Sequence, residues 1–233
     1  MPLDLEKVGV KTALRSFLGS NDLDTNTLAE FYQDLSRNSE EIRYSPGQHL
    51  FREGDLNEYI YIPVSGAIML ERSTSSGSRQ VFAFLLTGNI LGVSDQLIYN
   101  FSAKALNDSN VIKISQKLMK NIFERYPAIA KRYQQITSHI LSMILDQLFI
   151  MGQRTAHQRL AHLLLDMQNR LGHGTNKFHL PMSRQDIADY LGMSLETTSR
   201  GFSQLKKLDL INIENNYQIT IVERVKLTDY ANR

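Results

Sequence analysis

The sequence predicts an α+β fold in which two domains are joined by one long helix. Three observations support this prediction. Over residues 41–114, short runs rich in β-branched and aromatic residues alternate with glycine-containing turns. Over residues 127–150, apolar residues recur at helical spacing without a break. Over residues 182–210, two short segments with helix-capping residues flank a glycine.

The 233 residues suffice for two modest domains. Residues 152–233 carry a net charge of +3 and residues 1–151 a net charge of −1, which favours the C-terminal part as the one that meets phosphates. The chain has no cysteine, which excludes disulfides, thiolate metal sites and cysteine-ligated iron–sulfur clusters. It shows no signal peptide and no apolar run of the ~20 residues that a membrane span needs. We therefore expect a cytoplasmic protein without a membrane partner.

The first predicted domain spans residues 1–126 and is expected to sense an effector. Residues 1–40 read as short helices, and a further helix is predicted over 115–124. Short strands with regular turn signals between them indicate an antiparallel β-roll or jelly-roll barrel. The predicted strands are 42–44, 49–51, 59–64, 67–72, 79–85, 103–106 and 111–114.

The predicted helix over 127–151 carries an apolar seam that repeats at alternating spacings of three and four, as in a coiled coil. We interpret it as the dimerisation helix; the alternative is an amphipathic core helix of one subunit. A polar residue in the seam, Gln147, would fix its register. A second row, Leu141, Leu145 and Leu148, would then face the helix's own barrel. The seam residues are Ile129, Tyr133, Ile136, Ile140, Met143, Gln147 and Ile150.

The second predicted domain, 152–233, is expected to bind DNA and contains a pair of capped helices. Ser183 and Asp186 form a capping-box pattern, Gly192 ends the first helix, and Ser194 caps the second. A helix precedes the pair at 155–171, and a strand at 178–180. A β-hairpin follows, with strands at 210–213 and 217–222 and a turn at 214–216. This order is that of a winged helix-turn-helix.

The second helix of the pair has two faces. Leu195, Thr198, Phe202 and Leu205 should face inward, so that Glu196, Ser199, Arg200 and Ser203 lie outward. Arginine can bond bidentately to guanine, and glutamate can accept a hydrogen bond from cytosine N4. Thr197, Arg184 and the pair Lys206 and Lys207 are better suited to phosphates. The alternative is an ordinary helical pair with solvated charges, and Lys206 and Lys207 fit a solvated last turn equally well. The predicted DNA-binding residues are Glu196, Ser199, Arg200, Thr197, Arg184 and Ser183.

Barrel, long helix and winged helix in this order resemble the CRP/FNR superfamily of bacterial transcription factors. The run 196–200, Glu-Thr-Thr-Ser-Arg, is similar to the E-T-x-S-R of the FNR-like branch. The resemblance implies a homodimer that binds double-stranded DNA at an inverted repeat with TTGAT-like half-sites, and RNA polymerase as a partner. Gly201 departs from the family, which usually carries a larger residue there. A glycine at this position either permits close approach to DNA or weakens the helix.

The resemblance also indicates where an effector would bind. The cyclic-AMP branch carries G-E-L and R-S-A motifs, whose Glu and Arg hold the ribose and the phosphate. Here the matching stretches are Gly92-Val93-Ser94-Asp95 and Phe101-Ser102-Ala103. The predicted pocket residues, Gly92, Val93, Phe101 and Ser102, therefore lack both charges, and we expect no ordinary binding of cyclic AMP. The two alternatives are that the protein binds another anionic effector or that it has no effector.

Catalysis and cofactor binding find little support. The sequence has no Ser/His/Asp set, no phosphate-binding G-x-x-x-x-G-K-[ST] loop and no H-E-x-x-H, so we predict that the protein is not an enzyme. Its six histidines lack metal-ligand spacing; we predict no metal site and no cofactor, and a haem is the remaining possibility. The alternative function is a module that binds a cyclic nucleotide or another small ligand and regulates a protein partner.

Overall fold

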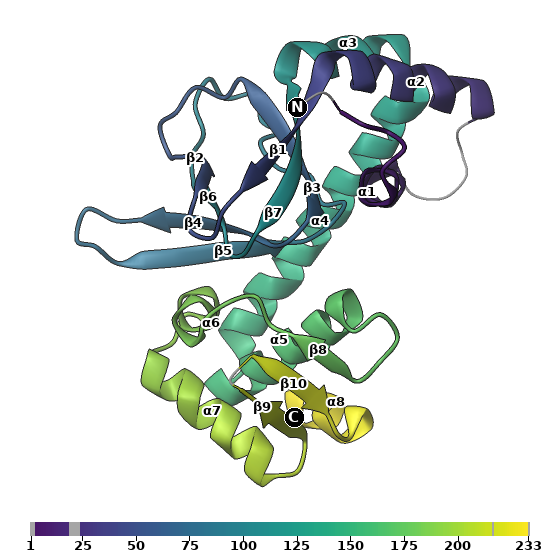
Figure 1. Cartoon of the computed structure of the whole chain (residues 1–233). Helices are drawn as coiled ribbons and strands as arrows, with labels where there is room; N and C mark the ends of the chain where they lie inside the picture. The colour runs from purple at the N-terminus through teal and green to yellow at the C-terminus, as the bar shows by residue number, and fades with distance from the viewer. Residues whose placement is uncertain (1–2, 19–23, 216, 233) are drawn as a thin grey trace. The chain divides into compact units, whose positions relative to one another are not determined.

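The computed structural model describes residues 3–18, 24–215 and 217–232 (Figure 1). The chain divides into two compact units, Met1–Ser76 with Phe82–Leu141, and Gly77–Val81 with Ser142–Arg233. The boundary falls within α4 (Pro127–Gln153), which continues through Gly152 without interruption. Within the described ranges, none of the helices has both the length and the apolar character that crossing a membrane requires.

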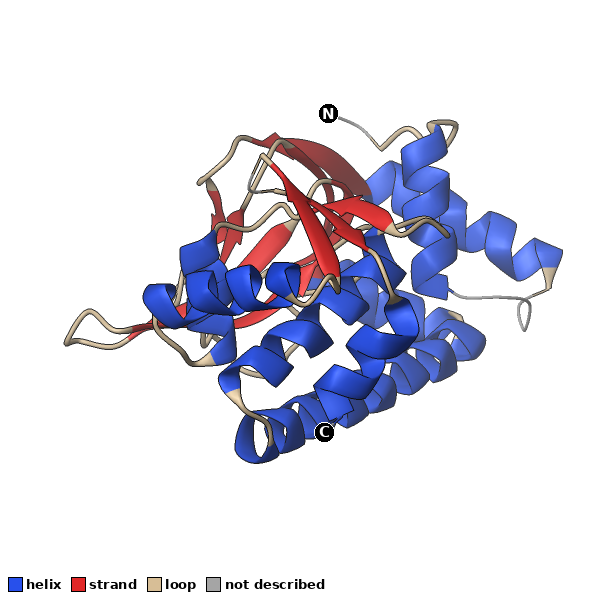
Figure 2. Ribbon diagram, turned by 90° about the horizontal axis from the view of Figure 1, so that it is seen from below, coloured by secondary structure: helices blue, strands red, loops and turns tan. Residues whose placement is uncertain are grey.

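The first unit holds two antiparallel sheets. One has the strand order β1-β7-β3 and the other β2-β6-β4-β5, so the predicted β-roll is confirmed. Figure 2 shows these strands in red. The first sheet consists of β1 (Ser39–Tyr44), β7 (Ser109–Ser115) and β3 (Tyr59–Ser65). The second consists of β2 (His49–Phe51), β6 (Ser102–Ala105), β4 (Ile68–Ser73) and β5 (Arg79–Leu85).

Strand β3 is buried on both faces, and its pleat separates two cores. Tyr61 packs into the barrel interior with Phe51, Tyr99 and Val111. Its neighbours Ile60 and Ile62 point to the opposite face and join the core beneath the helices, because successive strand residues alternate in direction. The predicted strand carried both rows as one apolar run, and the structure assigns each row to a different core.

Four helices cover the outer face of the β1-β7-β3 sheet. They are α1 (Val8–Leu18), α2 (Thr25–Asn38), α3 (Gln116–Arg125) and the first part of α4. Each contributes side chains that are at most 1% exposed, such as Leu14, Phe31, Ile122 and Ile129. Asp24 and Ser115 cap α2 and α3 by accepting hydrogen bonds from backbone N–H groups. The helices predicted in this domain are therefore present, and residues 19–23 between α1 and α2 lie outside the described residues.

The start of α4 corrects one part of the predicted dimer seam. Ile129 is fully buried in the core of its own unit, so the prediction that it contacts a second subunit is wrong. Tyr133 and Ile136 are partly buried and pack against the same core. Helical periodicity defined the apolar row correctly, but it carries no information on which surface that row meets. The alternative, a helix that packs on its own subunit, holds for this first part of α4.

The second unit is a three-helix core closed by a small sheet and a final helix. The strand order of the sheet is β8-β10-β9, as expected for the wing, and Asn215 takes φ 43° at its turn; Asn216 lies outside the described residues. Helix α8, which buries Leu227 and Ala231, is not predicted from the sequence. The elements are α5 (Ala156–Leu171), β8 (Lys177–His179), α6 (Arg184–Leu191), α7 (Leu195–Lys207), β9 (Ile211–Glu214), β10 (Gln218–Ile221) and α8 (Arg224–Asn232).

Candidate nucleic-acid interface

Helices α6 and α7 begin and end at the residues that the sequence predicts. Ser183 Oγ accepts from the Asp186 backbone N–H at 3.1 Å, and the Asp186 carboxylate accepts from the Ser183 N–H at 2.9 Å, which completes the capping box. Gly192 ends α6 in the left-handed region, with φ 60°. Ser194 Oγ then accepts from the Thr197 N–H at 3.1 Å and caps α7. These local bonds fix the turn between the two helices and the direction in which α7 leaves it.

Helix α7 has one buried and one exposed face. Thr198, Phe202 and Leu205 are at most 3% exposed, as predicted. Leu195 is 45% exposed, so the prediction that it faces inward is wrong. It is the first residue of α7 and lies at the margin of the packed surface. The exposed face of α7 therefore starts with an apolar residue, which sequence reasoning missed.

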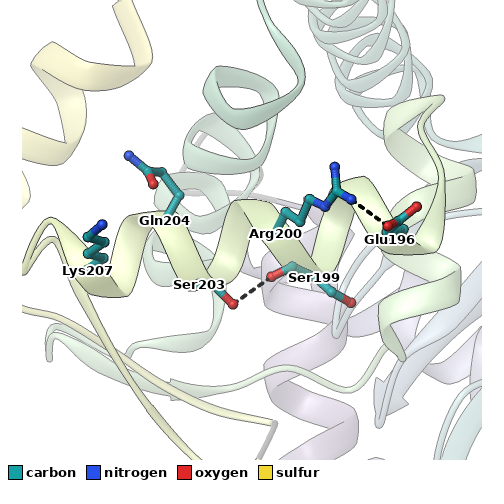
Figure 3. A pocket seen from close by; sticks show the side chains of 6 residues that line it. All are labelled: Glu196, Ser199, Arg200, Ser203, Gln204 and Lys207. Atoms are coloured by element: carbon teal, nitrogen blue, oxygen red, sulfur yellow. Dashed lines mark hydrogen bonds and ion pairs between the residues drawn. The ribbon is translucent and has the colours of Figure 1, made fainter.

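The exposed face forms a shallow depression that holds the predicted base-reading residues (Figure 3). Arg200 Nη2 donates to Glu196 Oε1 at 2.6 Å, one helical turn away. Both side chains are more than 70% exposed, so the pair adds little to stability, but it restricts where the guanidinium points. The structure thus brings Glu196, Ser199 and Arg200 together on one surface. The depression is lined by Glu196, Ser199, Arg200, Ser203, Gln204 and Lys207.

Gly201 lies on the opposite face of α7 and packs against α5. A Cβ atom there would lie 2.9 Å from Leu160 Cδ2 and 3.2 Å from His157 Cδ2. The explanation that Gly201 allows the backbone to approach DNA is therefore wrong, whereas the cost of glycine to the helix stays a prediction. Gly201 is buried, so it cannot bring the backbone close to DNA. Its missing side chain allows α7 and α5 to approach each other closely, which offsets the low helix propensity of glycine.

The residues predicted to contact phosphates make more contacts within the protein than the base-reading residues do. Arg184 stacks its guanidinium 3.2 Å from the centroid of the Phe202 ring and covers that core residue. Burial lowers the pKa of Arg184 to about 10, so the side chain keeps its positive charge at neutral pH. The hydroxyls of Ser183 and Thr197 are engaged in the two caps. The structure places Ser183 and Arg184 at the start of α6 and outside the lining of the depression.

The residues predicted to form an effector pocket belong to two different packing clusters. Val93 packs against the core beneath the helices, whereas Phe101 packs against the barrel interior. Gly92 has φ 84°, and a Cβ atom there would lie 2.6 Å from the Tyr59 carbonyl oxygen. Ser102 Oγ accepts from the Glu53 N–H at 3.0 Å. Each of the four residues thus has a structural role: Val93 and Phe101 pack in the two cores, Gly92 allows a close backbone approach, and Ser102 accepts a backbone hydrogen bond.

Aromatic rings occupy the interior of the barrel. Phe51 stacks on Tyr99 with ring centroids 3.6 Å apart, and the rings of Tyr61 and Phe101 lie 5.6 and 5.9 Å from that of Phe51. Burial raises the pKa of Tyr61 and of Tyr99, so both phenols stay neutral. The interior of the barrel is therefore lined mainly by apolar and aromatic side chains. In the described part of the chain, no three histidine, aspartate or glutamate side chains are grouped as metal ligands.

Both units match known domain families. Residues 158–230 match the family model of the Crp-like helix-turn-helix domain, and residues 41–126 match that of the cyclic nucleotide-binding domain. Among solved structures, FixK2 from Bradyrhizobium japonicum is 31% identical, with a TM-score of 0.79 over 82% of this chain and 96% of that chain.

Two similar proteins are regulators by name. The transcriptional activatory protein AadR of Rhodopseudomonas palustris is 32% identical over 78% of this chain and 77% of its own length. The nitrogen fixation regulation protein FixK of Bradyrhizobium diazoefficiens is 32% identical over 86% and 84%.

A β-roll of the cyclic nucleotide-binding type, a long helix and a winged helix-turn-helix with an exposed polar helix define a DNA-binding transcription regulator. The chain belongs to the CRP/FNR family. The Crp-like helix-turn-helix domain favours this function over the alternative of a module that acts only on a protein partner. The relatives named above are regulators by name.

Proposed function

We propose that this protein regulates transcription as a homodimer that binds an inverted repeat with TTGAT-like half-sites. The exposed face of α7, with Glu196, Ser199 and Arg200 on one surface, is the observation that supports it. In a helix-turn-helix dimer, the two reading helices enter successive major grooves about 34 Å apart. A fixed spacing of the half-sites follows from that geometry.

The side chains of α7 suit particular bases. The Arg200 guanidinium can donate to guanine O6 and N7, and Glu196 can accept from the N4 of a cytosine. Their ion pair keeps both groups together on the exposed face of α7. The exposed Leu195 offers an apolar contact that fits the methyl group of thymine, and such half-sites are rich in thymine.

For the dimer contact, we propose a row on α4 different from the predicted seam. Ile129, Tyr133 and Ile136 face the core of their own unit. Residues 140, 143 and 147 continue the same helical face. Leu141, Leu145 and Leu148 lie about a third of the way round the helix, at ~100° per residue, and they are 57–63% exposed. A second copy of the helix would bury this row, to which Ile144 also contributes.

We propose that DNA binding requires neither cyclic AMP nor a haem or other cofactor. Phe101 stands where an arginine would meet the cyclic phosphate, and aromatic rings occupy the barrel interior beside it. Titration of the protein with cyclic AMP should then release or absorb no heat of binding in calorimetry. It should also leave the affinity of the protein for DNA unchanged. We further propose that the protein acts in the cytoplasm, as an activator that contacts RNA polymerase, in line with the names of its relatives.

Substitution of Arg200 tests the proposed function. Arg200→Ala should weaken binding to a TTGAT inverted repeat by about 1–3 kcal/mol per subunit and leave binding to random DNA nearly unchanged. The matched control is Arg170→Ala, which removes an arginine of the same unit from α5. Equal losses on both DNAs would show that Arg200 contacts only phosphate. Genome-wide footprinting would then supply the natural operators.

A further inference from the structure

The two lysines at the end of α7 differ in the direction of their side chains. Lys207 lines the depression that also holds Glu196 and Arg200, and Lys206 is not part of that lining. Figure 3 shows the Lys207 side chain on the same side of the helix as Arg200 and Gln204. Helical geometry explains the difference, because Lys207 lies about two turns beyond Arg200, whereas Lys206 is rotated by ~100°. The two adjacent lysines are therefore not equivalent.

The charges in the depression single out Lys207. Glu196 and Arg200 form an ion pair at 2.6 Å, so their charges cancel at short range. The remaining lining residues, Ser199, Ser203 and Gln204, are neutral. Neither Lys206 nor Lys207 makes an ion pair with any residue in the described part of the chain. Lys207 is thus the side chain that gives this face a net positive charge.

We propose that Lys207 is a positioning residue that binds a DNA backbone phosphate at the far end of α7, while Lys206 stays in solvent. The inference rests on the proposed function, because it assumes that α7 enters the major groove. An ammonium group on a long stem suits a phosphate as a point charge. A cation at the end of a helix interacts favourably with the helix dipole, and this effect applies to both lysines. It therefore does not explain a role that Lys207 has and Lys206 lacks.

Salt dependence of DNA binding tests this inference. Each phosphate contact contributes about 0.9 to the slope of log K against log salt. A dimer that loses Lys207 from both subunits should therefore show a slope smaller in magnitude by about 1.8. Lys207→Ala should have this effect on operator and random DNA alike, whereas Lys206→Ala should leave the slope unchanged and Lys207→Arg should preserve it. The probe is duplex DNA with two inverted TTGAT half-sites, and circular dichroism confirms that each variant is folded.

The same experiment separates this inference from the function on which it rests. Arg200→Ala is measured beside the lysine variants. If Arg200→Ala abolishes discrimination between operator and random DNA while Lys207→Ala leaves the slope intact, only the role of Lys207 is refuted. The role of Lys207 would also be refuted if Lys207→Ala and Lys206→Ala gave equal salt slopes. The same holds if Lys207→Ala lowered the affinity only for DNA with one particular base pair. Failure of the unmodified protein to discriminate between the two DNAs would refute the proposed function itself.

Discussion

Arg200 and Glu196 form an ion pair with a distance of 2.6 Å between Nη2 and Oε1, one turn apart on the exposed face of α7. Such a pair contributes only about 0.3–0.5 kcal/mol to the stability of a helix. Its effect on recognition is larger, because a guanidinium held in one direction loses less rotational freedom when it binds a base. The glutamate thus has two tasks, to orient the arginine and to accept a hydrogen bond from a base.

Replacing Glu196 separates these two tasks. Glu196→Gln keeps a side-chain acceptor but removes the charge, and Glu196→Ala removes both. We expect both variants to remain folded with nearly unchanged stability, because the side chain is 72% exposed. Operator binding should fall more for Glu196→Ala than for Glu196→Gln, by electrophoretic mobility shift. Equal affinity of both variants and the unmodified protein would show that Glu196 neither orients Arg200 nor reads a base.

Gly201 gives a prediction of stability. In Gly201→Ala, a gain in helix propensity of about 1 kcal/mol is opposed by the short contact of the new Cβ atom with Leu160. We expect a change near zero in the free energy of unfolding. Gly201→Leu adds a branched side chain to the closely packed contact with α5 and should cost about 1–3 kcal/mol. Urea denaturation measures both; a stable Gly201→Leu protein would show that α5 and α7 are free to move apart.

Particular residues show what the sequence predicts well and what it does not. The caps at Ser183 and Ser194 were predictable because each depends on bonds within four residues of chain. The partner of Ile129 was not, because periodicity defines the face of a helix and not the surface that it meets. Leu195 continues the apolar row in sequence but begins its helix, beyond the packed region. Helix α8 has no continuous apolar stripe, and it packs mainly against α5 of the same unit, a contact that the sequence pattern does not reveal.

The face of α4 that forms the dimer contact can be tested with two matched substitutions. Leu148 and Met143 are 63% and 45% exposed, but they lie on different faces of the helix. Leu148→Glu should yield a monomer at micromolar concentration, because a charge buried between two apolar rows lacks a partner. Met143→Glu should remain a dimer. Analytical ultracentrifugation distinguishes the two states, and the reverse pattern would restore the seam predicted from the sequence.

His162 predicts how the stability of the second unit depends on pH. Burial is the main cause that lowers the pKa of its imidazole below 6.5, aided by Arg154 and opposed by a hydrogen bond to the backbone of Ala231. Its Nε2 atom is buried without a hydrogen-bond partner. The folded protein therefore binds a proton less readily than the unfolded chain, whose histidines titrate near pH 6.5. The contribution of His162 is fully present above that pH and is lost as the pH falls through the lowered folded pKa.

Replacing the imidazole with a group that does not titrate removes this dependence. The free energy of unfolding of the unmodified protein should fall between pH 7 and pH 5 more steeply than that of His162→Gln, measured by urea denaturation at several pH values. His139→Gln, a change at an exposed position on α4, serves as the control and should follow the unmodified protein. If the free energy of unfolding of His162→Gln falls with pH as steeply as that of the unmodified protein, another group takes up the proton on unfolding. The contact of α5 with the end of α8 is then insensitive to the charge on His162.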